Sequence, residues 1–140
     1  MNTPGASLGN LNRVVVACMD GARLKGHIYN FSPLKDSFDL LPVENPLQSR
    51  GCRVELKNLK AIFFVRDHTG NPAYKADPGA GCRHHGRRIQ ADFADGESIQ
   101  GMTEAYNPQK PGFFMFPMDE NGNNVRIFVI NRNVRKVRIL

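Results

Sequence analysis

The chain has no long apolar segment of the kind that a membrane-spanning helix needs. None of its 140 residues belong to an apolar run of about 18. Residues 1–12 also lack the basic-then-apolar order of a secretory signal. Its three cysteines, Cys18, Cys52 and Cys82, are an odd number without the spacing of a zinc site or a disulfide framework. We therefore expect a cytoplasmic protein that makes no contact with a membrane.

A sustained helical period is missing as well. No segment keeps the 3.6-residue apolar period over about ten residues, so helix content is expected to be low. Short apolar or alternating runs recur instead, with turn residues between them, which is typical of an all-β fold. The expected strands are 13–19, 22–31, 37–43, 52–57, 59–65, 88–94, 97–106, 112–118, 125–130 and 134–140.

The sequence repeats itself when residues 13–65 are shifted by 75 positions onto residues 88–140. Ten positions are then identical, and most of these are glycine, proline, aspartate or asparagine, the residues that fix turns. About 53 residues make a marginal core, so the two copies should pack on each other. We expect a disordered N-terminus at 1–11, a first unit at 12–65, a linker at 66–87 and a second unit at 88–140.

Two features of the repeat have a structural interpretation. Asp20-Gly21 and Asp95-Gly96 are typical hairpin turns, because glycine tolerates the positive φ that a tight turn needs. Gly26 and Gly101 lie inside the long second strand of each copy. A glycine there indicates a bulge or a sharp bend where a side chain would crowd the facing strand.

The runs DGARLKGHIYNF at 20–31 and VELKNLKAI at 54–62 resemble the Sm and Hfq pattern. This resemblance implies a tandem of two five-stranded Sm-like barrels packed together. The stretch GFFMFP at 112–117 resembles an uncharacterised bacterial family whose members are often associated with signalling domains. The Sm-type uridine site is not carried over, because Asp39-Leu40 and Lys57-Asn58 replace its asparagine and its Arg-Gly turn.

The formal net charge of +6 favours anionic partners, although a basic solvated surface has the same composition. Arg83 and Arg87 have the Arg-x-x-x-Arg spacing of the cyclic di-GMP signature of PilZ domains, but the second half of that signature does not follow. Phe114 is a candidate for stacking on a base, or a core residue like Phe113. The candidate ligand-binding residues are Arg83, Arg87, Arg88, Arg132, Arg135 and Phe114.

No set of residues suggests catalysis or a bound cofactor. The sequence shows no convincing pair of nucleophile and base. Cys82, His84 and His85, even with His68 or Cys52 nearby, fit no common zinc spacing, so no metal site is predicted.

We expect a non-catalytic binding or adaptor module of bacterial signalling that recognises a protein or a small anionic ligand at the groove between the barrels. One alternative is binding of RNA or another single-stranded nucleic acid through basic strands and exposed aromatics. Another is binding of cyclic di-GMP through Arg83 and Arg87.

Overall fold

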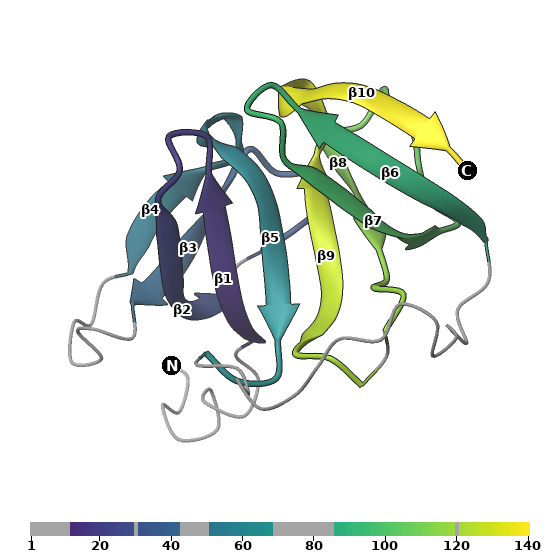
Figure 1. Ribbon diagram of the computed structural model, residues 1–140. Helices are drawn as coiled ribbons and strands as arrows, with labels where there is room; N and C mark the ends of the chain where they lie inside the picture. Colours follow the sequence, from purple (N-terminus) through teal and green to yellow (C-terminus); the bar gives the residue numbers. More distant parts are fainter. Residues whose placement is uncertain (1–11, 30, 43–50, 69–85, 120) are drawn as a thin grey trace.

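The computed structural model describes residues 12–29, 31–42, 51–68, 86–119 and 121–140. These residues are all-β, as the alternating runs predicted, and each expected strand has a counterpart (Figure 1). No helix in the described ranges is long and apolar enough to cross a membrane. The strands are β1 Asn12–Cys18, β2 Arg23–Tyr29, β3 Ser37–Pro42, β4 Cys52–Glu55, β5 Leu59–Val65, β6 Arg87–Phe93, β7 Ser98–Thr103, β8 Gly112–Met115, β9 Asn124–Ile130 and β10 Val134–Ile139. Two short 3-10 helices, η1 Leu56–Asn58 and η2 Asn131–Asn133, precede β5 and β10.

The strands form two antiparallel sheets. The larger has the order β4-β3-β2-β1-β5-β9-β8 and the smaller the order β10-β6-β7. A bridge between Met102 and Phe116 connects β7 to the end of β8, and each N–H donates to the other residue's carbonyl at 2.8 Å. Figure 1 shows β5 and β9 side by side in the middle of the molecule.

The structure does not show the two closed five-stranded barrels that we expected, because its described strands form one sheet of seven strands and one of three. The difference arises at β5, which pairs with β1 on one side and with β9 on the other. Strand β5 is buried on both faces, so its backbone N–H and C=O groups need partners along both edges. Ile62 pairs with Phe128, and neither side chain is exposed to solvent.

The strands divide into a first segment, β1 to β5, and a second segment, β6 to β10. Pairing registers of the first segment recur in the second with every residue number raised by 75. Examples are Val14↔Gly26 with Ile89↔Gly101, and Phe38↔Val54 with Phe113↔Val129. The correspondence found in the sequence therefore extends to the hydrogen-bonded backbone.

The Asp-Gly turns of the two segments have the same geometry. Gly21 and Gly96 adopt φ values of 94° and 92°, in the left-handed region that favours glycine. The Asp20 carboxylate accepts the backbone N–H two residues on at 2.9 Å, and that of Asp95 does so at 3.0 Å. Both hairpins are thereby fixed by the same pair of residues.

Gly26 and Gly101 lie where the next strand comes closest. A Cβ atom at Gly26 would clash with the carbonyl oxygen of Leu41, and one at Gly101 would clash with that of Phe116. The pairing of β1 with β2 and of β6 with β7 runs through these glycines without a shift. A close backbone approach, and not a bulge, therefore requires glycine here.

Each hydrophobic core contains residues from both segments. The core of the first segment includes Phe128 and Ile130 of β9, and Phe114 of β8 packs against it. The core of the second segment includes Ala61 of β5 and the fully enclosed Phe113. Each segment thus completes the hydrophobic core of the other.

Candidate binding groove

A groove with a volume of about 840 Å³ lies between the two segments. The first segment contributes residues near the end of β4 and in η1, and the second contributes the loop 106–111, η2 and the start of β10. The lining residues are Asp36, Glu55, Leu56, Lys57, Tyr106, Pro108, Gln109, Lys110, Pro111, Ile130, Asn131, Arg132, Val134, Arg135, Lys136 and Val137.

Two asparagines hold the walls of the groove in place. The Asn133 side chain of η2 donates to the carbonyl oxygens of Lys57 and Leu59, at 2.9 and 2.7 Å, and so joins η2 to the first segment. The Asn131 side chain donates to two carbonyl groups of the loop 106–111, at 2.9 and 2.8 Å. Since these bonds link separate parts of the chain, the groove is formed by fixed backbone.

The charged side chains around the groove are mainly basic. Five of them are Lys or Arg, and two are acidic, Asp36 and Glu55. Lys57 lies 3.8 Å from Glu55. Within the described part of the chain, Arg132, Arg135 and Lys110 form no ion pair. Their charges are therefore open to a ligand, while Leu56, Tyr106, Val134 and Val137 supply an apolar lining.

The structure brings together two of the arginines that the sequence singled out. Arg132 of η2 and Arg135 of β10 both line the groove. Arg88 of β6 lies elsewhere and donates to the Gln100 side chain at 3.3 Å. Arg87 lines a smaller cavity of about 360 Å³, and Arg83 lies outside the described residues. The pair Arg83 and Arg87 can therefore not be placed as a unit.

Phe114 does not line the groove. It is half-buried, and its ring contacts those of Phe31, Phe64 and Phe128. The Arg126 guanidinium of β9 lies over the rings of Phe64 and Phe114, 4.4 and 4.6 Å from their centroids. Burial lowers the pKa of Arg126. The sequence repeat does not point to Arg126, because the corresponding residue of the first copy is Gly51.

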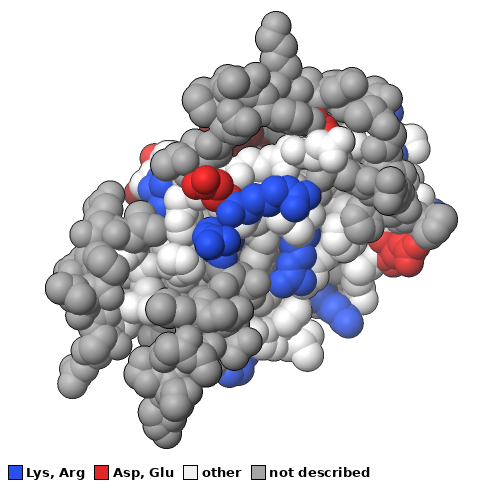
Figure 2. Space-filling model, turned by 90° about the horizontal axis from the view of Figure 1, so that it is seen from below, with Lys and Arg blue, Asp and Glu red and all other residues white. Residues whose placement is uncertain are grey.

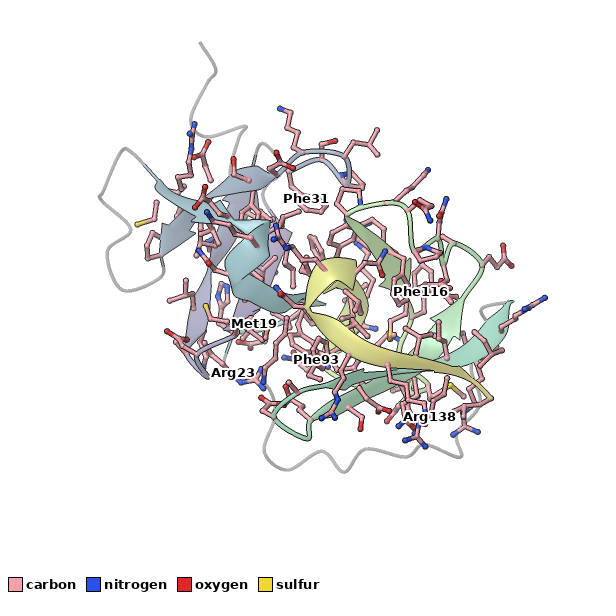
Figure 3. All side chains as sticks on the ribbon, turned by 90° about the horizontal axis from the view of Figure 1, so that it is seen from above. Met19, Arg23, Phe31, Phe93, Phe116 and Arg138 are labelled. Atoms are coloured by element: carbon pink, nitrogen blue, oxygen red, sulfur yellow. The ribbon has the colours of Figure 1, made fainter. Side chains whose placement is uncertain are left out.

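Lys60 of β5, the counterpart of Arg135, is buried and joins the two segments. Its ammonium group forms ion pairs with Asp95 and Glu97 at the second Asp-Gly turn, the latter at 3.0 Å. The hydrogen bond from Lys60 lowers the pKa of Asp95, and the same bond raises the pKa of Lys60. Arg23 adds a bond to Glu97 at 3.3 Å. The Lys60 ammonium also lies over the ring of Phe93, which Figure 3 labels together with Arg23.

Basic side chains also gather on the face seen from below (Figure 2). Arg13 and Arg66 lie at the lower ends of β1 and β5, where Arg13 donates to the Arg66 carbonyl at 3.3 Å. The His27 ring lies 5.0 Å from that of His68, and burial lowers the pKa of His27. His68 lies 2.7 Å from the carbonyl oxygen of Gly26. These groups bind backbone or one another.

Metal-ligating side chains do not cluster in the described ranges, where no group of three or more His, Cys, Asp and Glu residues could hold an ion. Cys18 is half-buried and Cys52 is exposed. Cys82, His84 and His85 lie outside the described residues.

One protein family matches almost the whole chain. Residues 10–140 match the profile of a family of unknown function (DUF6982). The chain belongs to this family. No curated protein and no solved structure matches it.

Proposed function

We propose that the chain is a non-catalytic binding module that recognises carboxylate or phosphate groups of a ligand at the groove between the two segments. The observation that carries this proposal is the excess of basic over acidic side chains around one groove of about 840 Å³. Positive side chains that line a concave surface concentrate anions there. A cytoplasmic adaptor role in bacterial signalling, which the sequence predicted, belongs to the same proposal.

The chemistry of the lining favours binding over catalysis. The described residues that line the groove include no histidine, cysteine or serine, and of its two carboxylates Glu55 forms an ion pair with Lys57. Its apolar side chains, among them Tyr106 and Val137, suit the apolar part of a ligand. Arg132 and Arg135 supply planar guanidinium groups that can bind a carboxylate or a phosphate through two hydrogen bonds.

We also propose that each segment is related to the Sm-like barrel. The support is the order of the strands, which is β4-β3-β2-β1-β5 in the first segment. In the second segment the corresponding order is β9-β8-β7-β6-β10, once the bridge between β7 and β8 is included. Each unit is then an opened barrel, and the two units join where β5 pairs with β9. We call this junction the seam.

Calorimetric titration of the full chain with tripolyphosphate tests the anion site. We expect binding that weakens as sodium chloride is raised, because the rim charges are exposed to salt. The double variant Lys110→Glu with Arg132→Glu should lower the affinity by about tenfold or more. Lys25→Glu, an exposed change on β2, is the control and should leave the affinity unchanged. A loss in Lys25→Glu about half as large, in proportion to its smaller change of charge, would show that only the net charge matters.

The nucleic-acid alternative has less support from the surface. The exposed large hydrophobic residues of the described part are Met19, Leu24, Leu34, Val125, Ile139 and Leu140, and none is aromatic. A stacking platform for bases needs exposed aromatic rings, whereas Tyr106, the aromatic residue that lines the groove, is half-buried. A labelled single-stranded oligonucleotide that bound more tightly than tripolyphosphate, and was lost in the double variant, would favour that alternative. Cyclic di-GMP in the same titration, with Arg87→Ala, tests the other one.

A further inference from the structure

Strands β5 and β10 are equivalent in the two segments, but their outer edges differ. On one side β5 pairs with β1, and β10 pairs with β6 in the corresponding register. On its other side β5 pairs with β9, whereas no strand of the described residues pairs with the other side of β10. Phe64 of β5 is 4% exposed, while its counterpart Ile139 is 49% exposed. Apolar residues of this size on an open edge indicate a missing neighbour.

The first segment shows what such a neighbour does. Strand β9 pairs with β5 and places Phe128 and Ile130 in the first core. Phe31 then meets Phe128, with ring centroids 5.2 Å apart. In the second segment Tyr106 is the counterpart of Phe31, and it lines the open groove together with Val134 and Val137 of β10. The part of the groove at Val137, together with the smaller cavity between Tyr106 and Ile139, therefore corresponds to the place that β9 occupies in the first segment.

We propose that an extended segment of a partner protein, with alternating apolar and acidic residues, pairs with β10 as an added strand. This inference rests on the anion-binding function proposed above and names the ligand. Successive side chains of a strand point to opposite faces. Apolar residues of the segment would cover Val134, Val137 and Ile139, and acidic ones would meet Arg135 and Lys136. Strand addition of this kind obtains affinity from main-chain bonds and specificity from alternate side chains.

The backbone of β10 has donors available for this pairing. The N–H of Leu140 donates to the Arg88 carbonyl at 2.8 Å, toward β6. Backbone groups alternate in direction along a strand, so the N–H of Ile139 points to the open side. A substitution at Ile139 can therefore remove an outward donor without removing a bond to β6.

A second copy of the chain does not suit this edge. The strand equivalent to β9 is β4, where Arg53 and Glu55 take the positions of Phe128 and Ile130. Pairing β4 of one copy with β10 of another would place both charges against apolar residues, which is unfavourable. The occupant that the edge favours is thus a different protein.

Labelled peptides test the inference on the full chain. Fluorescence anisotropy should show binding of EVEVEVE, binding about tenfold weaker for EEVVVEE, and none for KVKVKVK, because only the first matches both faces. Ile139→Pro removes the outward N–H and should abolish binding of EVEVEVE. Ile139→Val keeps that donor and should bind like the wild type. Hydrogen exchange at Val137 and Ile139 should slow when EVEVEVE binds.

The outcomes separate this inference from the anion-binding proposal. Equal affinity for EVEVEVE and EEVVVEE, with tripolyphosphate still bound, would overturn strand addition and leave the anion site in place. Loss of tripolyphosphate binding as well would remove both proposals. Self-association in sedimentation velocity that Ile139→Pro abolished would identify a second copy as the occupant and overturn the inference. A thermal melt of Ile139→Pro near that of the wild type shows that the variant is folded.

Discussion

Strands β5 and β10 pair with β1 and β6 in the same register, yet within the described residues the other edge of β5 is covered and that of β10 is open. Beside β5 the neighbouring strand β9 completes an apolar core. Beside β10 the corresponding place is a groove with a basic rim. Since the strand order is the same in the two segments, the difference between the two edges comes from their side chains.

The substitutions between equivalent positions explain this difference. Ala61 and Phe63 on β5 correspond to Lys136 and Arg138 on β10, so two buried or half-buried apolar residues become exposed cations. Charged residues on an edge strand discourage pairing with unrelated strands. The Arg138 guanidinium forms an ion pair with the Asp92 carboxylate at 2.9 Å, so this cation of the edge strand has a partner.

The largest effect is expected where a seam residue is truncated. Phe128→Ala should destabilise the chain by about 3–5 kcal/mol, because this fully buried ring fills the first core. Arg53→Ala, at the equivalent position of β4, should change stability by only about 0.5 kcal/mol or less, since Arg53 is exposed. Urea unfolding of both variants measures the difference. Equal costs would show that the two junctions are alike.

A smaller and equal effect is expected at the paired glycines. Gly26→Val and Gly101→Val should each cost about 1–3 kcal/mol, because the new side chain meets the carbonyl group of the next strand. Thermal melts of the two variants should therefore agree, although one glycine lies in each segment. A wild-type melt for either variant would show that the close approach at that position is relieved without cost.

Strands and turns could be predicted from the sequence because they depend on local patterns. Alternation over a few residues identified β3 and β9, and Asp-Gly identified both hairpins. The division into sheets could not be predicted, because it depends on the pairing of β5 with β9. Strand β9 begins 59 residues after the end of β5 (from Val65 to Asn124). Pattern alone does not reveal which edge a buried strand will take.

The groove was predictable only in part for the same reason. Arg132 and Arg135 stood out because the last strand is densely basic. Lys110 and Tyr106 come from a loop whose position relative to β10 follows from long-range packing. Lys60 could not be separated from Arg135 by sequence, although one is buried in an ion pair and the other is exposed.

The identical asparagines of the two segments provide a sharper comparison. Asn133→Ala should cost about 1–2 kcal/mol, because its side chain donates to the carbonyl groups of Lys57 and Leu59 across the seam. Asn58→Ala should be nearly neutral, since Asn58 is exposed and its side chain makes no hydrogen bond within the described residues. Chemical denaturation compares them. A larger cost for Asn58→Ala would contradict the assignment of the covered seam.

The smallest effect is expected from the ion pair of Lys60, because Asp95 and Glu97 are partly exposed and solvent screens them. The pKa of Asp95 is lowered, so its contribution is present above the ordinary aspartate value of about 3.9 and is lost as pH falls through the lower folded value. The melting temperature of the wild type should therefore fall more between about pH 7 and about pH 3 than that of Lys60→Met. Arg135→Met, at the equivalent position of the open edge, should keep the wild-type pH dependence, since Arg135 has no such partner in the described ranges. Parallel curves for the wild type and Lys60→Met would show that the ion pair does not connect the two segments in solution.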